Sequence, residues 1–186
     1  MSAISRQSAP LGIRVWDPLV RLLHWTLAPA VLIAFATGEH GGTFHERVGY
    51  VALAAAMLRV AWGFVGSAHA RFTDFVPGPG RLVRHVRAVA TARDRRYVGH
   101  NPLGGAWIVL MLGLVAAAGA TGWVLSSVGE HGHRALEHWH EGLANTLIAA
   151  AVVHVAGVAW ESLRHRENLV GAMFTGRKRA PGPAED

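Results

Sequence analysis

The sequence predicts an all-α integral membrane protein, an up-and-down bundle of four helices. The chain of 186 residues is 51% hydrophobic, and only 16% of its residues are charged, whereas a soluble domain usually carries about 25%. It contains four apolar runs, each about long enough to cross a bilayer as a helix. Its basic residues gather between particular runs instead of spreading evenly. We expect the helices at about 17–38, 45–66, 104–127 and 138–162, within one membrane domain over 1–186.

The first helix has a clear start signal. Asp17 suits the N-cap and Pro18 suits the first helical position, where a missing N–H costs nothing. No charge follows between Leu22 and Gly38. Residues 1–15 lack the apolar run and cleavage site of a signal peptide, so we expect a cytoplasmic tail.

The second helix follows a short polar turn, Glu39 to Thr43, and begins near His45. Arg59 lies inside its apolar run. Because fourteen residues return a helix to nearly the same face, Arg59 lies roughly in line with His45.

The longest connection, 67–103, joins the second and third helices and is basic. It contains seven arginines: Arg71, Arg81, Arg84, Arg87, Arg93, Arg95 and Arg96. The stretch from Gly80 to Arg95 is typical of an amphipathic surface helix.

The third helix has no ionisable residue and is rich in glycine and alanine, which allow close helix contact in lipid. A second short polar loop, Glu130 to Glu137, leads to the fourth helix. A basic tail, Arg164 to Arg179, then follows.

The basic residues predict the orientation. The long connection and the two tails hold most of them, while the other loops hold only Arg47 and Arg134. By the positive-inside rule, both termini and the long connection are cytoplasmic. The net charge of +6 is thus explained by topology, and we expect no nucleic-acid partner. The absence of cysteine excludes disulfides, iron–sulfur clusters and covalent attachment of c-type haem.

Two histidines of the fourth helix lie on one stripe. His140 and His154 are fourteen residues apart, which brings the second side chain within roughly 40° of the first and about 21 Å along the axis. His138 does not share this stripe, because sixteen residues place it about 160° from His154.

The predicted topology gives each histidine a depth and a partner. His45 and His140 lie at the outer level, and His24 and His154 lie at the inner level. This is the geometry of two bis-histidine haems stacked across a four-helix bundle. A single tetrahedral zinc site is excluded, because about 21 Å separates two of the four histidines.

Other polar residues have simpler alternatives. Arg59 would pair with a haem propionate at the inner level, or would snorkel toward the cytoplasmic surface. Gly49 and Gly157 would clear space for a flat macrocycle, or would serve helix packing. The tryptophans are typical of membrane interfaces. We expect the remaining histidines to be solvated: His40, His69, His85, His100, His131, His133, His138 and His165.

These motifs together resemble the prokaryotic cytochrome b561 family, which includes the cytochrome b subunits of nickel–iron hydrogenases and formate dehydrogenases. The resemblance covers roughly residues 12–179. The matching segments are Trp16-Asp17-Pro18 with Arg21 and His24-Trp25, His45-x-x-x-Gly49, Arg59 with Trp62-Gly63, His140-Glu141, His154-x-x-Gly157, and Glu167-Asn168-Leu169-Val170-x-x-Met173-x-x-Gly176.

The resemblance implies two non-covalent haem b groups held by His24, His45, His140 and His154, in a multi-pass protein of the bacterial cytoplasmic membrane. It implies electron transfer between quinone and a redox protein, for example a c-type cytochrome. Any catalysis would be oxidation or reduction of quinone at a haem edge. The short chain favours a stand-alone cytochrome. Two alternatives stay open: the membrane anchor of a hydrogenase- or dehydrogenase-type complex, and a haem-free histidine-based metal transporter.

Overall fold

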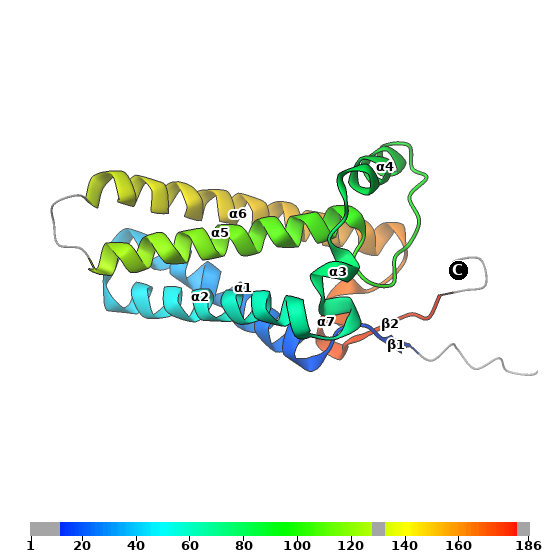
Figure 1. The fold of residues 1–186 in the computed structure, drawn as a ribbon, viewed down its shortest axis with the longest axis horizontal. Helices are drawn as coiled ribbons and strands as arrows, with labels where there is room; N and C mark the ends of the chain where they lie inside the picture. The colour runs from blue at the N-terminus through cyan, green and yellow to red at the C-terminus, as the bar shows by residue number, and fades with distance from the viewer. Residues whose placement is uncertain (1–11, 128–132, 182–186) are drawn as a thin grey trace, which may run out of the picture.

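The computed structural model describes residues 12–127 and 133–181. Four long helices lie side by side along its long axis (Figure 1): α1 (Pro18–Thr37), α2 (Gly42–Val65), α5 (Pro102–Ser127) and α6 (His133–Arg164). Each is long and apolar enough to cross a membrane. The chain is therefore an all-α, multi-pass membrane protein. Glu130 and His131, named above as loop residues, lie outside the described part, as do residues 1–11 of the expected N-terminal tail.

The helices start where local chemistry favours a start. The Asp17 carboxylate accepts a hydrogen bond from the Val20 amide at 2.9 Å, and Pro18 follows at the first helical position. The expected boundaries hold within about three residues for α1, α2 and α5. For α6 the expected start was wrong: 133–137, expected to be loop, is helical. These five residues contain neither glycine nor proline, and most are good helix formers.

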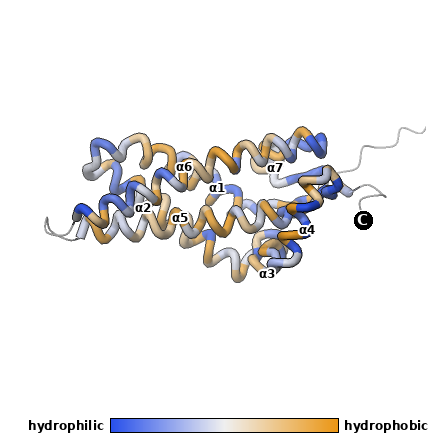
Figure 2. The backbone as a smooth tube through the Cα atoms, turned by 90° about the horizontal axis from the view of Figure 1, so that it is seen from above, coloured by the Kyte–Doolittle hydropathy of each residue, from blue (hydrophilic) through white to orange (hydrophobic). Residues whose placement is uncertain are grey.

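Neighbouring helices pack in the order α1, α2, α5, α6, while α1 and α6 make only slight contact. The core consists of small and aliphatic side chains: Ala30, Ala52, Ala56, Leu112, Val115 and Leu147. At the α2–α5 contact, a Cβ on Gly119 would lie 2.8 Å from a Leu53 methyl carbon, so only glycine allows this approach. Hydrophobic residues run along the long helices, and hydrophilic residues gather toward the ends (Figure 2).

Most of the shorter elements gather at one end of the long helices, whereas the turn between α1 and α2 lies at the other end (Figure 1). Two 3₁₀ turns, η1 (Gly38–His40) and η2 (Ala68–Ala70), follow α1 and α2. The connection between α2 and α5 holds α3 (Phe72–Phe75) and α4 (Pro79–Ala90). The surface helix expected over 80–95 is thus present, but it ends at Ala90. The element after α6 is α7 (Leu169–Thr175).

A small antiparallel sheet joins the two ends of the described chain. Strand β1 (Ile13–Arg14) pairs with β2 (Arg177–Lys178). The carbonyl of Gly176 also accepts hydrogen bonds from the amides of Val15 and Trp16. Gly176 has φ +78°, and a Cβ there would lie 2.7 Å from the Trp16 carbonyl oxygen, so the position requires glycine.

Candidate functional site

Three helices position the four predicted histidines. α1 carries His24, α2 carries His45, and α6 carries both His140 and His154. All four side chains are half-buried. We call His45 and His140 the distal pair, because they lie at the end of the helices away from the β1–β2 sheet. His24 and His154 form the proximal pair, nearer that sheet.

The structure brings the distal pair together. The ring centres of His45 and His140 are 6.0 Å apart, and their planes are inclined by 82°. Two imidazoles that bind one metal ion from opposite sides, with bonds of about 2 Å, have ring centres roughly 6 Å apart. The observed spacing therefore fits a shared metal ion.

Backbone carbonyls orient both distal rings. His45 Nδ1 lies 2.9 Å from the Ala34 carbonyl oxygen, and His140 Nδ1 lies 3.0 Å from that of Ala118. A carbonyl oxygen can only accept, so each Nδ1 carries the hydrogen, and each neutral ring keeps an Nε2 lone pair. This is the arrangement that metal-binding histidines commonly adopt. The Thr121 hydroxyl also lies 3.1 Å from His140 Nδ1.

A glycine leaves room for the His140 ring. A Cβ on Gly122 of α5 would lie 3.1 Å from His140 Cε1. Gly49 and Gly157 differ, because a Cβ at either position would meet nothing within 4 Å. Neither of these two glycines is therefore required for close helix packing within the described residues.

The proximal pair is held differently. His24 and His154 lie close enough to interact electrostatically. Within residues 12–127 and 133–181, neither ring forms a hydrogen bond. The His24 ring packs edge-on against Trp25, with centres 5.1 Å apart.

Arg59 is buried in the last two turns of α2, at the end of the helices that carries the sheet. It is only 7% exposed, and its guanidinium lies 5.7 Å from the centre of the Phe75 ring. Its Nη1 is buried and has no hydrogen-bond partner among the described residues. Such an arginine does not snorkel to the surface. An unpartnered buried guanidinium nitrogen suits the carboxylate of a bound group.

Two histidines expected to be solvated are not, and these expectations were wrong. His100 packs between Trp16 and Phe75, with ring centres 4.5 Å and 4.8 Å away. Burial, and then the charge of Arg59, lowers the pKa of His100 to about 3. His85 is 5% exposed, and burial lowers its pKa. Both lie in the long connection, where polar composition concealed the packing.

Several motif residues have structural roles at the proximal end. The Asp17 carboxylate accepts hydrogen bonds from Trp62 Nε1 at 3.1 Å and Ser67 Oγ at 2.5 Å, which ties the start of α1 to the end of α2. Buried Glu167 pairs with Arg96 at 2.7 Å and with Lys178 at 3.3 Å.

A second ion-pair group closes the end of α6. Asp94 pairs with Arg164 at 2.6 Å and with His165 at 3.3 Å. The hydrogen bond from Arg164 lowers the pKa of Asp94. Sequence reasoning missed this group because its members lie about 70 residues apart and form no local motif.

The donor set fits an iron macrocycle with carboxylate arms. Two pairs of imidazoles would supply nitrogen ligands at two depths, and an unpartnered buried guanidinium lies toward the same end of the helices as the proximal pair. The residues along α1, α2 and α6 thus fit two groups of haem type.

Comparison with known proteins agrees with this chemistry. The family model described as prokaryotic cytochrome b561 matches residues 15–176. Among similar proteins, the probable Ni/Fe-hydrogenase B-type cytochrome subunit of Rhizobium leguminosarum bv. viciae is 26% identical, over 95% of this chain and 91% of its own length. The proteins of the same name from Bradyrhizobium diazoefficiens and Azotobacter vinelandii are 23% and 25% identical, each over 89% of this chain and over 85% and 88% of their own lengths. No solved structure matches the chain significantly.

Proposed function

The chain belongs to the prokaryotic cytochrome b561 family, and from this premise we propose that it binds two haem b groups and passes electrons across the membrane between quinone and a redox protein partner. Membership in this family makes the chain a membrane b-type cytochrome that transfers electrons. The number of haems, the ligands, the quinone and the partner are the proposal.

The arrangement of the distal pair carries this proposal. The two rings are 6.0 Å apart, and each has Nδ1 on a backbone carbonyl, which leaves its Nε2 lone pair available to a metal ion. Because α6 continues to His154 on the same stripe, a second site with His24 follows about 21 Å along the axis.

Each residue has a distinct role in this scheme. His45 and His140 ligate the distal haem iron, and His24 and His154 ligate the proximal one. Arg59 pairs with a propionate of the proximal haem. Haem b supplies a one-electron redox couple when bound, and two histidine ligands leave its iron no open position for substrate. The surrounding helices exclude water and fix the ligand orientation.

We also propose that both termini, α4 and α7 face the cytoplasm of a bacterium. The arginine-rich connection and both ends of the described chain lie at the same end of the helices (Figure 1), as the positive-inside rule requires of a cytoplasmic end. Quinone would react at a haem edge, and a c-type cytochrome or another redox protein would exchange electrons with the other haem.

A second candidate role is the membrane anchor of a hydrogenase-type complex. The similar proteins are named as B-type cytochrome subunits of Ni/Fe-hydrogenase, and the matches span at least 85% of the Bradyrhizobium and Rhizobium proteins. The two roles share the same haem sites and differ only in the partner. Purification from the native membrane distinguishes them, since an anchor would retain a large redox subunit.

Spectroscopy and haem counting test the proposal. The purified protein should show a b-type α band in a reduced-minus-oxidised spectrum, and a pyridine haemochrome assay should give two haems per chain. His154→Ala should lower this number to one. A protein without a b-type band would be a haem-free protein such as a metal transporter, and a His154→Ala variant that keeps two haems would refute the pairing.

A further inference from the structure

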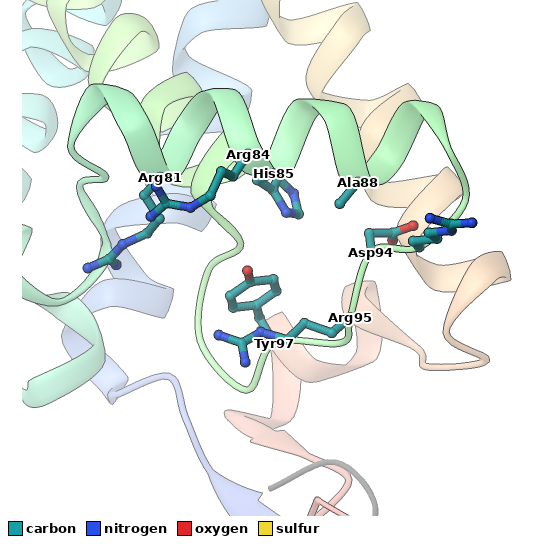
Figure 3. Close-up of a pocket in the computed structure, with 8 residues that line it drawn as sticks. Arg81, Arg84, His85, Ala88, Asp94, Arg95 and Tyr97 are labelled. Atoms are coloured by element: carbon teal, nitrogen blue, oxygen red, sulfur yellow. The ribbon is translucent and has the colours of Figure 1, made fainter.

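A basic pocket lies between α4 and the segment that follows it, away from the histidine pairs. Its volume is about 620 Å³. Four arginines line it, two from α4 and two from the following segment: Arg81, Arg84, Arg93 and Arg95. In Figure 3, His85 reaches from α4 toward Tyr97, and Arg95 lies beside the tyrosine. The guanidinium of Arg95 is 5.3 Å from the Tyr97 ring centre.

The pocket contains a buried polar atom with no partner. His85 is 95% buried, since only 5% of its surface is exposed, and its ring packs edge-on against Tyr97 at 5.4 Å between centres. Its Nε2 has no hydrogen-bond partner among the described residues. A buried polar atom without a partner is costly, so this position favours a ligand that can hydrogen-bond to the imidazole.

The lining of the pocket carries an excess of positive charge. Its one acidic residue, Asp94, is engaged by Arg164 and His165. In the part of the chain that the structure describes, none of the four lining arginines forms an ion pair. Guanidinium groups suit an anion with several oxygens, because each can donate two hydrogen bonds.

The pocket lies beside the end of the fourth candidate membrane span. Arg164, which pairs with Asp94 of the pocket wall, is the last residue of the fourth membrane span. Figure 1 shows α4 nearly end-on while the long helices run across the page, so α4 crosses their ends. Val83 and Val86 of α4 are 49% and 45% exposed, which suits a helix resting on the apolar edge of a bilayer.

We propose that this pocket binds the phosphate group of an anionic ligand through Arg81, Arg84 and Arg93, with His85 at its base. An anionic phospholipid headgroup and a soluble phosphate both offer this chemistry. The binding involves neither the haems nor their histidines, so it stands or falls independently of the redox function.

The test uses the full chain in nanodiscs of phosphatidylcholine with and without phosphatidylglycerol, and native mass spectrometry counts the retained anionic lipid. The double variant Arg84→Gln/Arg93→Gln should weaken retention about tenfold or more, as expected for lost charge-assisted hydrogen bonds. Arg87→Gln is the matched control, because Arg87 lies on the same helix, carries the same charge and does not line the pocket. Arg84→Lys, which keeps the charge, should retain part of the binding, and its elution on size exclusion checks folding.

A second arm titrates inorganic phosphate against the detergent-solubilised protein at constant ionic strength. Lipid retention that depends on Arg84 and Arg93, without phosphate binding, identifies a headgroup. Phosphate binding with the same dependence identifies a soluble ligand. The proposal is overturned if Arg87→Gln weakens binding as much as the double variant, or if neither probe binds.

Discussion

In the distal pair, backbone carbonyls of α1 and α5 orient both rings, whereas in the proximal pair neither ring has a hydrogen bond within the described residues. The proximal end contains instead Arg59, a buried arginine with an unpartnered nitrogen, and His100, a buried neutral histidine. The distal site is therefore pre-oriented by the backbone. The proximal site relies on side-chain charge and packing, so the two sites should respond to different changes.

Removing one proposed ligand from each pair should have the largest effect, and it tests whether the two sites are independent. His45→Ala should remove the distal haem and His24→Ala the proximal one, leaving about one haem per chain in each case, because the affected haem would lose one of the two side chains proposed to ligate it. Haemochrome assays and the split of the α band measure this. Loss of both haems in either variant would show that the sites are not separable.

Filling the space beside His140 should disturb only the distal site. Gly122→Ala would place a Cβ 3.1 Å from the His140 ring, and overpacking of this kind costs about 1–3 kcal/mol. We expect weaker retention of the distal haem during haem-transfer titration with apomyoglobin. Gly113→Ala on the same helix is the control, since its Cβ would meet nothing within 4 Å. Equal effects of the two variants would contradict a specific role of Gly122.

Neutralising Arg59 should affect only the proximal site. A positive charge beside a haem disfavours the oxidised state, because that state carries one more positive charge than the reduced state. Arg59→Leu removes such a charge, so the midpoint potential of the proximal haem should fall by about 60 mV. This shift is a tenfold change in the equilibrium constant of a one-electron couple. Potentiometric titration resolves the two haems. Arg59→Lys should retain most of the potential, and a shift confined to the distal haem would contradict the assignment.

Lowering the pH should destabilise the proximal end before the distal end. The loss of stability should be small near neutral pH. The folded pKa of His100 is about 3, below its unfolded value of 6.5, so its contribution to stability is lost progressively as pH falls below 6.5. Asp94 acts in the same direction below 3.8, because ion pairing lowers its folded pKa. Hydrogen exchange of 165–181 between pH 7.5 and 4.5 measures this. His100→Phe should flatten the profile above pH 4.5, and an unchanged profile would contradict the role of His100.

The spans, the cap at Asp17 and the histidine stripe of α6 could be predicted because each depends on local periodicity or on residues within one helix. The hydrogen bond from His45 to Ala34 could not, because any residue supplies the same carbonyl. His85 is buried against Tyr97, and His100 is buried between Trp16 and Phe75. These contacts join separate segments of the chain, which a polar sequence does not reveal. Ion pairs such as that of Arg96 with Glu167 join residues 71 apart and leave no local pattern.

The β1–β2 pairing has a consequence for synthesis of the chain. Gly12 and Arg177, which share a hydrogen bond at this sheet, are 165 residues apart. The chain is synthesised at about 5–20 residues per second, so β2 is translated roughly 10–30 s after β1. A product released after residue 154 but before residue 177 would keep every histidine of both pairs, but its N-terminal segment would have no partner strand. Strand β1 can therefore pair only after translation has reached β2.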